Sequence, residues 1–443
     1  MIANLESYPA YKDSSADWLD EIPKEWDVLL ARRFCRVFAG ATPSRDEPSF
    51  WNGGRVPWLA SGDVNRRRIS TASQFITDAG FRASSTKWIR PGSVVIALAG
   101  QGKTKGMAAL VDFHATCNQS LGVLEPSLSL CNPEFLLYYF ESRYRDIRGL
   151  VGDLRDGLNL EHLKQLPVPI PPIAEQLMIV SVLNYIDSRI HRLIEAKERL
   201  VQLLEEEKRT IIHHAVTRGL DRDAVFTPSS ITWLEAVPGH WRRSRLKGIA
   251  WMKAGRTITS DSIKEKGEYP VFGGNGLRGF ASDFTHEGDR ILIGRQGALC
   301  GNVHLVGGQF WATEHAIVVE VRNQCNIRWM SLLLVAMDLN QYSEAAAQPG
   351  LSTDRIRNLE VPVPPLAEQE GIAEWVDRST AGADEVQKKA LRQISLLREY
   401  RTRLISDVVT GKLDVREAAA NLPDDPDADD SALSERLEEV AAG

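Results

Sequence analysis

The sequence predicts two globules that are joined by two long helices. The helices are expected to form an antiparallel coiled coil, and the whole chain to be a pseudo-two-fold internal repeat. Three observations support this architecture. Two short segments occur twice in the same order. Each copy of the second segment is followed by a segment of about 40 residues, and apolar residues recur along both of these segments every 3.5 residues on average.

The duplicated segments are the first element of this prediction. WLDEIPKEW at Trp18–Trp26 matches WLEAVPGHW at Trp233–Trp241 with an offset of 215 residues. VPIPPIAEQ at Val168–Gln176 matches VPVPPLAEQ at Val361–Gln369 with an offset of 193 residues. Two ordered matches of this length indicate that the chain arose by duplication.

The stretches between the duplicated segments are the second element. They cover about residues 27–157 and 242–350, show little similarity, and differ by 22 residues in length between their flanking matches. A retained connector beside each divergent globule indicates one frame that presents two different recognition surfaces. The predicted boundaries are 1–157 for the first globule, 158–221 for its linker and long helix, 222–350 for the second globule, 351–421 for its linker and helix, and 422–443 for a tail.

The long helices are the third element. Because prolines exclude a helix interior, each Pro-rich segment is expected to lead, extended, into a helix that starts at Glu175-Gln176 or at Glu368-Gln369. These four residues are grouped with the seam and partner-docking residues. The predicted seam is Ile179, Leu183, Ile186, Ile190, Leu193, Lys197, Leu200, Leu204, Glu207 and Ile211 in the first helix, and Ile372, Val376, Ser379, Ala383, Val386, Ala390, Gln393, Leu397, Tyr400 and Leu404 in the second. The alternative is a pair of ordinary core helices inside one large domain.

The charge and the cysteine content of the sequence limit the possible classes of function. The net charge of −6 argues against a nucleic-acid binder, but residues 422–443 carry −7, so the remaining chain is near neutral and the tail is expected to be disordered. The five cysteines are widely spaced without a C-x-x-C pair, which predicts neither a zinc site nor a disulfide framework. The sequence has no signal-like segment and no apolar run of membrane-spanning length, and therefore predicts a cytoplasmic protein without a membrane partner.

With these features the sequence resembles the DNA-specificity subunit of a type I restriction–modification system, from about Trp18 to Asp414. The resemblance depends on the two Pro-x-x-Trp openings, the doubled Val-Pro-x-Pro-Pro-x-Ala-Glu-Gln segments, GATPSR at Gly40–Arg45 followed by FWNGGRVPW at Phe50–Trp58, and GEYPVFGGNG at Gly267–Gly276. No single mark is decisive, but their order and duplication make the resemblance specific.

The resemblance implies two target-recognition domains, each a mixed α/β globule, that read a bipartite site in double-stranded DNA. It implies a subunit that performs no chemistry and binds no cofactor. Two modification (methyltransferase) subunits would bind S-adenosylmethionine, and ATP- and Mg-dependent restriction subunits would translocate and cut. A helix from Glu175 to Thr217 would be roughly 65 Å long, about two turns of B-DNA, and could set the gap between the half-sites.

Three motifs suggest enzyme activity and are expected to be decoys. Ala97–Thr104 fits a relaxed phosphate-loop pattern, but Gly106 interrupts the helix that such a loop needs at Lys103. Gly274–Gly279 fits G-x-G-x-x-G, but the next strand follows too soon for a helix and no acidic residue follows at the expected distance. Phe272–Gly276 resembles a methyltransferase cofactor motif, but the chain lacks the Asn/Asp-Pro-Pro-Tyr/Phe loop that binds a flipped adenine.

Candidate DNA contacts are side chains that can pair with base edges or phosphates. They are Asn65, Arg66, Arg67, Arg68, Gln101, Lys103, Lys105, Asn118 and Gln119 in the first globule, and Asn275, Arg278, Arg295, Gln296, Glu314 and His315 in the second. Two alternatives remain open at this point: a coiled-coil adaptor that grips proteins without reading DNA, and a nucleotide-binding enzyme that uses one of the decoy loops.

Overall fold

The chain falls into two compact units in a computed structural model. The first unit consists of residues 1–195 and 394–443, and the second unit of residues 196–393, so each long helix is shared between the units. The structure describes residues 5–16, 18–100, 103–151, 157–297, 300–343 and 350–423. Gln101 and nearly all of the acidic tail lie outside these described residues.

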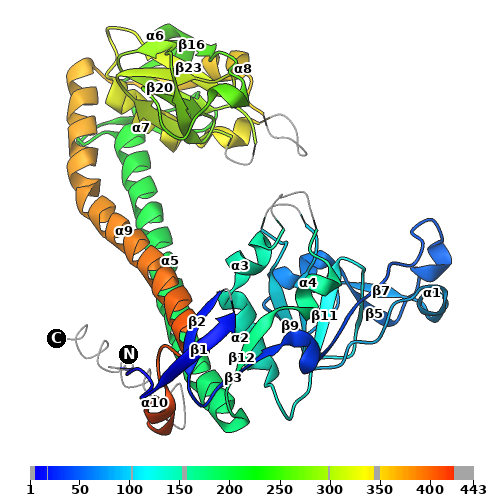
Figure 1. The fold of residues 1–443 in the computed structure, drawn as a ribbon. Coiled ribbons are helices and arrows are strands. Elements are labelled where there is room, and N and C mark those ends of the chain that lie inside the picture. Colours follow the sequence, from blue (N-terminus) through cyan, green and yellow to red (C-terminus); the bar gives the residue numbers. More distant parts are fainter. Residues whose placement is uncertain are drawn as a thin grey trace. The chain divides into compact units, whose positions relative to one another are not determined.

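The globule of the first unit is built on two larger sheets, beside two two-stranded ones (Figure 1). The five-stranded sheet has the order β4 (Cys35–Ala39), β11 (Leu121–Pro126), β8 (Ser93–Ala97), β9 (Ala108–Val111) and β6 (Arg68–Ile69). The three-stranded sheet has the order β10 (Thr116–Cys117), β5 (Val56–Leu59) and β7 (Gln74–Ile76). All residues of β8 and β9 are buried, which explains their continuous apolar sequences.

The second unit repeats this plan despite its divergent sequence. Its central sheet has the order β16 (Ala250–Ala254), β23 (Ala316–Val321), β20 (Arg290–Gly294) and β21 (Val303–Val306), which corresponds to β4-β11-β8-β9. Its other sheet has the order β18 (Gly276–Ala281), β17 (Tyr269–Gly273), β22 (Gln309–Ala312) and β19 (His286–Glu287). The mixed α/β fold class and the internal repeat are therefore confirmed.

Short elements complete each unit. The first unit adds β1 (Tyr11–Ala16), β2 (Leu19–Pro23), α1 (Asp78–Ala83), α2 (Pro133–Ser142), α3 (Tyr144–Gly149), α4 (Leu160–Lys164) and α10 (Arg416–Ala420). The second unit adds β13 (Phe226–Pro228), β14 (Ala236–Pro238), α6 (Leu246–Ile249), α7 (Ile327–Ala336) and α8 (Thr353–Arg357). Most of the extra residues of the first unit lie between β5 and β8, where α1 and β6 have no counterpart.

The strands by which the chain enters and leaves each globule are paired. In the first unit, β3 (Asp27–Leu30) pairs antiparallel with β12 (Pro167–Ile170). In the second unit, β15 (Arg242–Arg245) pairs antiparallel with β24 (Glu360–Val363). Prolines are tolerated in β12 and β24 because each sheet has only two strands, so a missing N–H need not break a ladder. Both Pro-rich segments are thus extended, as predicted.

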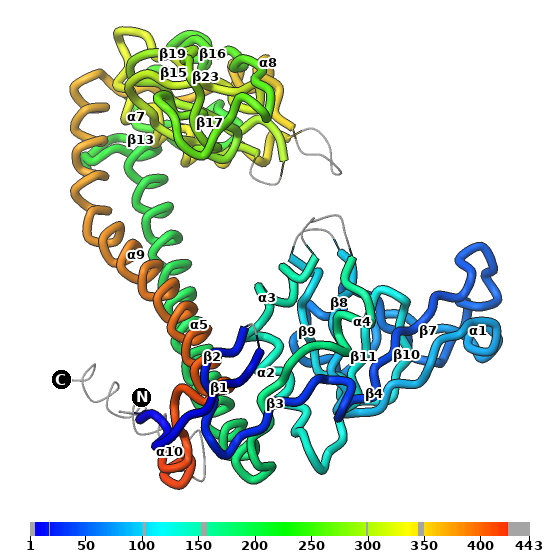
Figure 2. The backbone as a smooth tube through the Cα atoms, in the orientation of Figure 1, coloured from blue at the N-terminus to red at the C-terminus, as the bar shows by residue number. Residues whose placement is uncertain are grey.

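The long helices α5 (Ile173–Arg218) and α9 (Leu366–Val409) pair antiparallel within each unit (Figure 2). In the second unit, Lys197 Nζ donates to Gln393 Oε1 at 2.7 Å, and Lys208 Nζ donates to Gln387 Oε1 at 3.4 Å. Residues further along α5 therefore pair with residues earlier in α9, as in an antiparallel pair. In the first unit, Arg401 Nη2 donates to Asp187 Oδ2 at 3.1 Å. The antiparallel arrangement is confirmed inside both units.

The predicted seam is buried or half-buried at 13 of its 20 positions, and at the other seven the next residue along the chain is buried or half-buried instead. Leu193 and Leu200 are exposed, while their neighbours Ile194 and Val201 are buried. On α9, Val386 is likewise exposed and Ile394 replaces the predicted Gln393. Buried seam residues that were predicted correctly are Ile179, Leu183, Ile190, Ile372, Val376, Ala390 and Leu404, and half-buried ones are Ile186, Lys197, Leu204, Ile211, Ala383 and Leu397.

The shift has a geometric cause. The buried positions advance by four residues where the prediction took three, from Ile190 to Ile194 within the helix pair and from Val376 to Thr380. An α-helix turns once every 3.6 residues, and a helix packed on a globule needs no strict alternation of three and four. After this step, the buried residues Ile194 and Val201 each lie one position after the residues that the prediction placed in the seam.

Within the described residues, no helix is both long and apolar enough to cross a membrane. All five cysteines are buried free thiols. Burial raises the pKa of Cys35, Cys117 and Cys325 to about 12, so these thiols stay protonated and behave as small apolar side chains.

Candidate nucleic-acid interface

Each unit builds a polar edge at the same end of its central sheet. Gly40 directly follows β4 and Gly255 directly follows β16. A Cβ atom on Gly40 would lie 1.8 Å from Cys117 O, and one on Gly255 would lie 2.3 Å from Thr313 O. Only glycine allows this approach, which brings the loop after the first strand against the segment before β11 or β23.

The first polar edge consists of Thr42, Asn118 and Gln119. The Thr42 hydroxyl donates to Gln119 Oε1 at 2.5 Å, which leaves the exposed Gln119 amide nitrogen free to donate outward. Asn118 Oδ1 accepts from Ser120 N at 3.1 Å, and Asn118 N donates to Leu59 O at 3.0 Å. The two predicted amide side chains therefore lie together on a backbone that both sheets hold in place.

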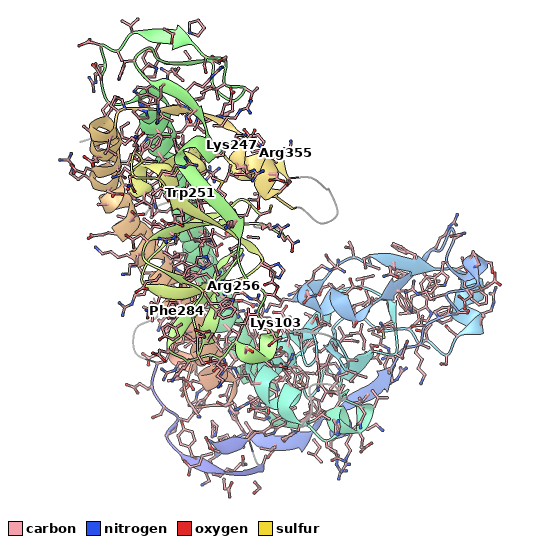
Figure 3. The ribbon with its side chains drawn as sticks, turned by 90° about the horizontal axis from the view of Figure 1, so that it is seen from above. Lys103, Lys247, Trp251, Arg256, Phe284 and Arg355 are labelled. Carbon is pink, nitrogen blue, oxygen red and sulfur yellow. The ribbon has the colours of Figure 1, made fainter. Side chains whose placement is uncertain are left out.

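The turn between β8 and β9 is a hairpin and not a phosphate loop. The two strands pair antiparallel, and no helix begins at Lys103, which is exposed (Figure 3). Gly106 has a φ of +84°, a conformation that breaks a helix and favours glycine. Lys105 is only 2% exposed, so the prediction that it is presented for DNA contact is wrong in this structure.

The basic segment 65–68 has its cations paired inside the unit. Arg66 forms an ion pair with Asp63, and Arg68 donates to Asp112 Oδ2 and Glu134 Oε1 at 2.8 Å each. Asn65 is exposed and donates to Gly62 O at 2.9 Å. The side chains of Arg66 and Arg68 are 41% and 57% exposed, so both remain accessible to a phosphate.

Arg67 faces the long helices instead. It donates to Glu141 Oε1 at 2.6 Å, lies 3.4 Å from Asp187 Oδ2 on α5, and stacks 4.4 Å over the Tyr138 ring. Asp187 in turn accepts from Arg401 on α9. Arg67 therefore belongs to a joint between the first globule and the helix pair, and is not a candidate DNA contact.

The second polar edge consists of Gln296, Thr313, Glu314 and His315. His315 Nδ1 lies 2.9 Å from Gln296 Oε1, and His315 Nε2 lies 3.4 Å from Glu314 Oε1. Thr313 Oγ1 and Glu314 Oε2 are buried without a hydrogen-bond partner among the described residues. A buried polar atom without a hydrogen bond lowers the stability of the folded protein. These two atoms therefore favour a binding site in which a group of another molecule supplies the missing hydrogen bonds.

The β17–β18 hairpin lies beside this edge and contains the second decoy motif. Gly276 has a φ of +91° at the hairpin turn, and no helix follows it. Asn275 is exposed and accepts from Asn302 Nδ2 at 3.3 Å, and Arg278 is exposed on β18. Burial lowers the pKa of His304, whose ring lies 3.6 Å from a Cβ position on Gly276.

The structure adds residues that the sequence prediction missed. Arg256 is exposed directly after Gly255, at the end of β16 that lies beside the second polar edge (Figure 3). In the first unit, Arg45 stacks 3.9 Å over the Trp51 ring and donates to Gln74 Oε1 at 3.2 Å. The signal that could have found Thr42 and Arg256 is the repeated Gly-x-Thr at 40–42 and 255–257.

An equivalent clamp lies at the start of each long helix. In the first unit, the Trp26 indole donates to Glu175 Oε1 at 3.1 Å, and the Tyr8 hydroxyl donates to the same oxygen at 2.6 Å. Burial raises the pKa of Tyr8, and its hydrogen bond to Glu175 raises it further, so this phenol remains a donor. Gln176 accepts from Asn132 N at 2.7 Å, which fixes the residue that caps α2.

The second clamp repeats the Trp–Glu and Gln–Asn contacts. The Trp241 indole donates to Glu368 Oε1 at 3.0 Å, and Gln369 Oε1 accepts from Asn326 N, the cap of α7, at 2.8 Å. Gln176 and Gln369 are at most 1% exposed and satisfied inside the chain. The structure thus gives the four residues predicted for the seam or docking an internal role, which explains why they occur twice.

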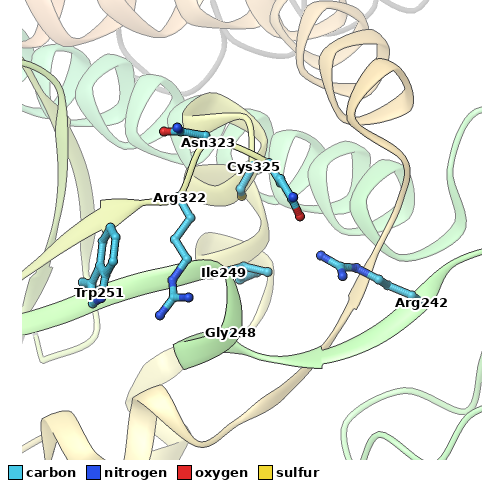
Figure 4. A pocket seen from close by; sticks show the side chains of 8 residues that line it. Arg242, Gly248, Ile249, Trp251, Arg322, Asn323 and Cys325 are labelled. Carbon is cyan, nitrogen blue, oxygen red and sulfur yellow. The ribbon is translucent and has the colours of Figure 1, made fainter.

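A separate hollow lies at the opposite end of the second unit's central sheet (Figure 4). It has a volume of about 340 Å³ and is lined by Arg242, Trp251, Arg322 and Asn323 among others. The Arg322 guanidinium stacks 4.6 Å over the Trp251 ring, and its Nε atom is buried without a described partner. Because β16 and β23 separate this hollow from the second polar edge, it is not part of that edge.

Comparison with known proteins gives one consistent result. The family model for the type I restriction modification DNA specificity domain matches residues 23–202 and 238–396. The specificity subunit of the type I restriction enzyme EcoprrI from Escherichia coli is 31% identical over 373 residues, which cover 81% of this chain and 88% of that protein. The StySPI specificity subunit of Salmonella potsdam is 20% identical and covers 90% of this chain and 92% of that protein.

A solved structure shares the fold. A chain from a structural study of complex assembly and conformational transition of the type I R-M system matches with a TM-score of 0.62 and 17% sequence identity. The match covers 88% of this chain and 99% of that chain.

Proposed function

This chain belongs to the family of type I restriction–modification specificity subunits, and from that premise we propose that its two units read the two halves of one bipartite DNA target. The first unit reads through Thr42, Asn118 and Gln119, and the second through Gln296, Glu314 and His315. The observation that carries the proposal is the repeated clamp, because one frame holds two polar edges of different chemistry.

The chemistry of the edges suits base recognition. Amide side chains supply a donor and an acceptor together, which is what adenine needs in the major groove, and a carboxylate accepts from the cytosine amino group. The exposed Lys103, Arg66, Arg68, Arg256 and Arg278 supply positive charge for phosphates, which positions the protein without sequence preference.

The helix pair is proposed to set the gap between the half-sites. The 46 residues of α5 correspond to about 69 Å of helix, close to two turns of B-DNA. A change in helix length would then change the number of unread base pairs without changing either half-site.

The chain is proposed to be non-catalytic. Both decoy loops are hairpin turns, and the described residues contain no group of three or more His, Cys, Asp or Glu side chains that could hold a metal ion. Methyl transfer with S-adenosylmethionine and ATP- and Mg-dependent cleavage are assigned to two modification subunits and to restriction subunits, which would act with this chain on DNA in the cytoplasm.

The proposed docking surface for these partners is the outer face of the helices. Apolar side chains there are exposed although they lie on well-packed helices: Leu177, Met178, Leu193, Leu200 and Leu203 on α5, and Trp375, Val386, Leu391, Leu396 and Tyr400 on α9. In the first unit, Leu396, Tyr400, Leu404 and Leu413 line a hollow of about 440 Å³. Exposed apolar patches of this kind favour a protein partner.

Co-expression with the candidate modification subunit tests the proposal. The complex should co-purify, shift a discrete bipartite duplex, and leave a bipartite methylation motif in the host genome by methylome sequencing. An adaptor would bring down a partner without DNA preference, and an enzyme would turn over alone. Either result would contradict the proposed function.

A further inference from the structure

The hollow beside β16 and β23 contains two arginine side chains without an acidic partner. Arg242 comes from β15, and Arg322 directly follows β23. Figure 4 shows their guanidinium groups on either side of Ile249. Within the described part of the chain, neither guanidinium forms an ion pair or donates a hydrogen bond, and Arg322 Nε is buried. A buried donor without an acceptor lowers stability, so the hollow favours a ligand that accepts hydrogen bonds.

Trp251 positions Arg322 and adds an apolar surface to the hollow. The Arg322 guanidinium stacks 4.6 Å over the Trp251 ring, and Trp251 is 55% exposed. Glu320 lies opposite Trp251 in the sheet, but its carboxylate pairs with Arg290 Nη2 at 3.4 Å. No described residue that lines the hollow is acidic. The hollow therefore combines two cations with an exposed aromatic ring.

The shared fold of the two units does not require these arginines. The first unit has Asp27 at the place of Arg242, since both residues pair with the last residue but one of matching strand pairs or its equivalent in β12 and β24. It has Ser127 at the place of Arg322, directly after β11 or β23. Because both units form the same strand pairings with different residues at these places, the two arginines indicate a role that belongs to the second unit.

The hollow adjoins the second clamp. Arg242 directly follows Trp241, whose indole is bound at the start of α9. Cys325 lines the hollow and directly precedes Asn326, whose backbone N–H is also bound by α9. A protein that docks on the start of α9 would therefore lie beside the hollow.

The shape and composition of the hollow favour a carboxylate of a protein over a phosphate of DNA. A carboxylate at the tip of one Asp or Glu side chain can enter a recess and accept from two guanidinium groups. A DNA phosphate lies between two sugars on a continuous backbone, which needs an open surface. The hollow also lies at the end of β16 and β23 away from the second polar edge. Tryptophan and arginine are the residue types that contribute most to binding in protein interfaces.

We propose that this hollow binds an acidic side chain of the modification subunit that docks on the second unit. The inference rests on the proposed function and deepens it, because it adds a contact that only one of the two modification subunits makes. Arg242 and Arg322 hold the carboxylate from two sides, and Trp251 packs against the side chain that carries it.

Native mass spectrometry of the full chain, titrated with the candidate modification subunit, tests this inference. The wild-type chain should bind two subunits. Arg242→Gln with Arg322→Gln should weaken one of the two binding steps by about 30-fold or more and leave the other unchanged, because the partner's carboxylate loses both cations. A 1:1 complex should then persist where the wild-type chain is 2:1, and the subunit that stays bound shows that the variant is folded.

Lys264→Gln with Lys266→Gln is the matched control, because it removes the same charge from exposed positions of the same unit. Both binding steps should keep their wild-type affinity in this control.

The inference is overturned if the arginine variant binds both subunits as the wild-type chain does, or if both steps weaken equally. It is also overturned if the variant assembles normally but its DNA binding depends less on salt, since the hollow would then hold a phosphate. A wild-type chain that binds no modification subunit would instead contradict the proposed function.

Discussion

The Trp26 indole donates a 3.1 Å hydrogen bond to Glu175 Oε1, and this pair ties the opening of the first globule to the start of α5. The two residues are 149 positions apart in the chain, and both are buried. Its counterpart, Trp241 with Glu368, does the same in the second unit. The first prediction concerns this contact.

Trp26→Phe should lower the free energy of unfolding of the first unit by about 2–3 kcal/mol, because a buried carboxylate loses a donor and the smaller ring leaves space. Urea unfolding followed by circular dichroism measures this. Trp88→Phe is the control, since Trp88 is 42% exposed, and it should change stability by less than about 0.5 kcal/mol. Equal effects of both variants would contradict the role of the clamp.

Two adjacent residues distinguish the seam from the docking face. Ile194→Asp should destabilise the helix pair by about 3 kcal/mol or more, because Ile194 packs against Ile394 and a buried carboxylate there has no partner. Leu193→Asp should leave stability nearly unchanged but weaken co-purification of the modification subunit, because Leu193 is exposed. If Leu193→Asp destabilised the helix pair and Ile194→Asp did not, the seam register predicted from the sequence would be correct.

The charged joint of the first unit should be stronger than a surface ion pair. Asp187 faces both Arg67 and Arg401 with its side chain 18% exposed, so Asp187→Ala should cost about 2 kcal/mol after allowance for solvent. Asp384 pairs with Lys208 with its side chain 54% exposed, and Asp384→Ala should cost less than about 1 kcal/mol. Denaturant unfolding of the two variants compares the pairs directly.

Arg66 and Lys103 of the first unit should contribute to the salt dependence of DNA binding. Arg66→Gln with Lys103→Ala should weaken binding by the assembled complex and reduce the slope of log K against log salt by about 0.9 for each phosphate that is no longer neutralised. Lys12→Ala with Lys24→Ala, on and just after the β1–β2 hairpin, serves as the control. An unchanged slope in the first double variant would reject both assignments.

Acid should destabilise the second unit through two histidines. Burial lowers the pKa of His286 and His304 below the ordinary value of 6.5, and nearby Arg290 and Arg256 lower that of His286 further. The unfolded chain therefore binds more protons, so the stabilising contribution is complete above about pH 6.5 and is lost as the pH falls below it.

Thermal unfolding at pH 7.5 and pH 5.5 measures this effect. His286→Gln with His304→Gln should reduce the drop in melting temperature between the two pH values, whereas His191→Gln, on an exposed side chain, should not. A drop that is equal in all three proteins would assign the pH dependence to other groups.

The sequence predicted the repeat, the extended Pro-rich strands and the antiparallel helices, because duplication and 3.5-residue periodicity are visible without coordinates. It did not predict the seam register, since periodicity alone does not show where a buried position is followed by another four residues later, as from Ile190 to Ile194 and from Val376 to Thr380. The clamp was also missed. Trp26 and Glu175 each lie in a repeated segment, but nothing in a sequence shows that two repeated segments touch each other.

The candidate DNA contacts were predicted by residue type, and residue type alone could not separate surface from interior. Arg67 and Lys105 look like their neighbours in sequence, yet one is held by Glu141 and Asp187 and the other is buried. Gln296 and His315 were predicted individually, but the hydrogen bond between them joins residues 19 positions apart, which the sequence does not show to be neighbours.

The paired strands β3–β12 and β15–β24 have an evolutionary consequence. Each globule begins and ends on neighbouring strands that are held by backbone hydrogen bonds, which do not depend on side-chain identity. A foreign globule inserted between the same two strands would keep the Trp–Glu contact of the clamp and the helix pair. A host could therefore acquire a new target by a single recombination event, while every other part of the machinery stayed as it was.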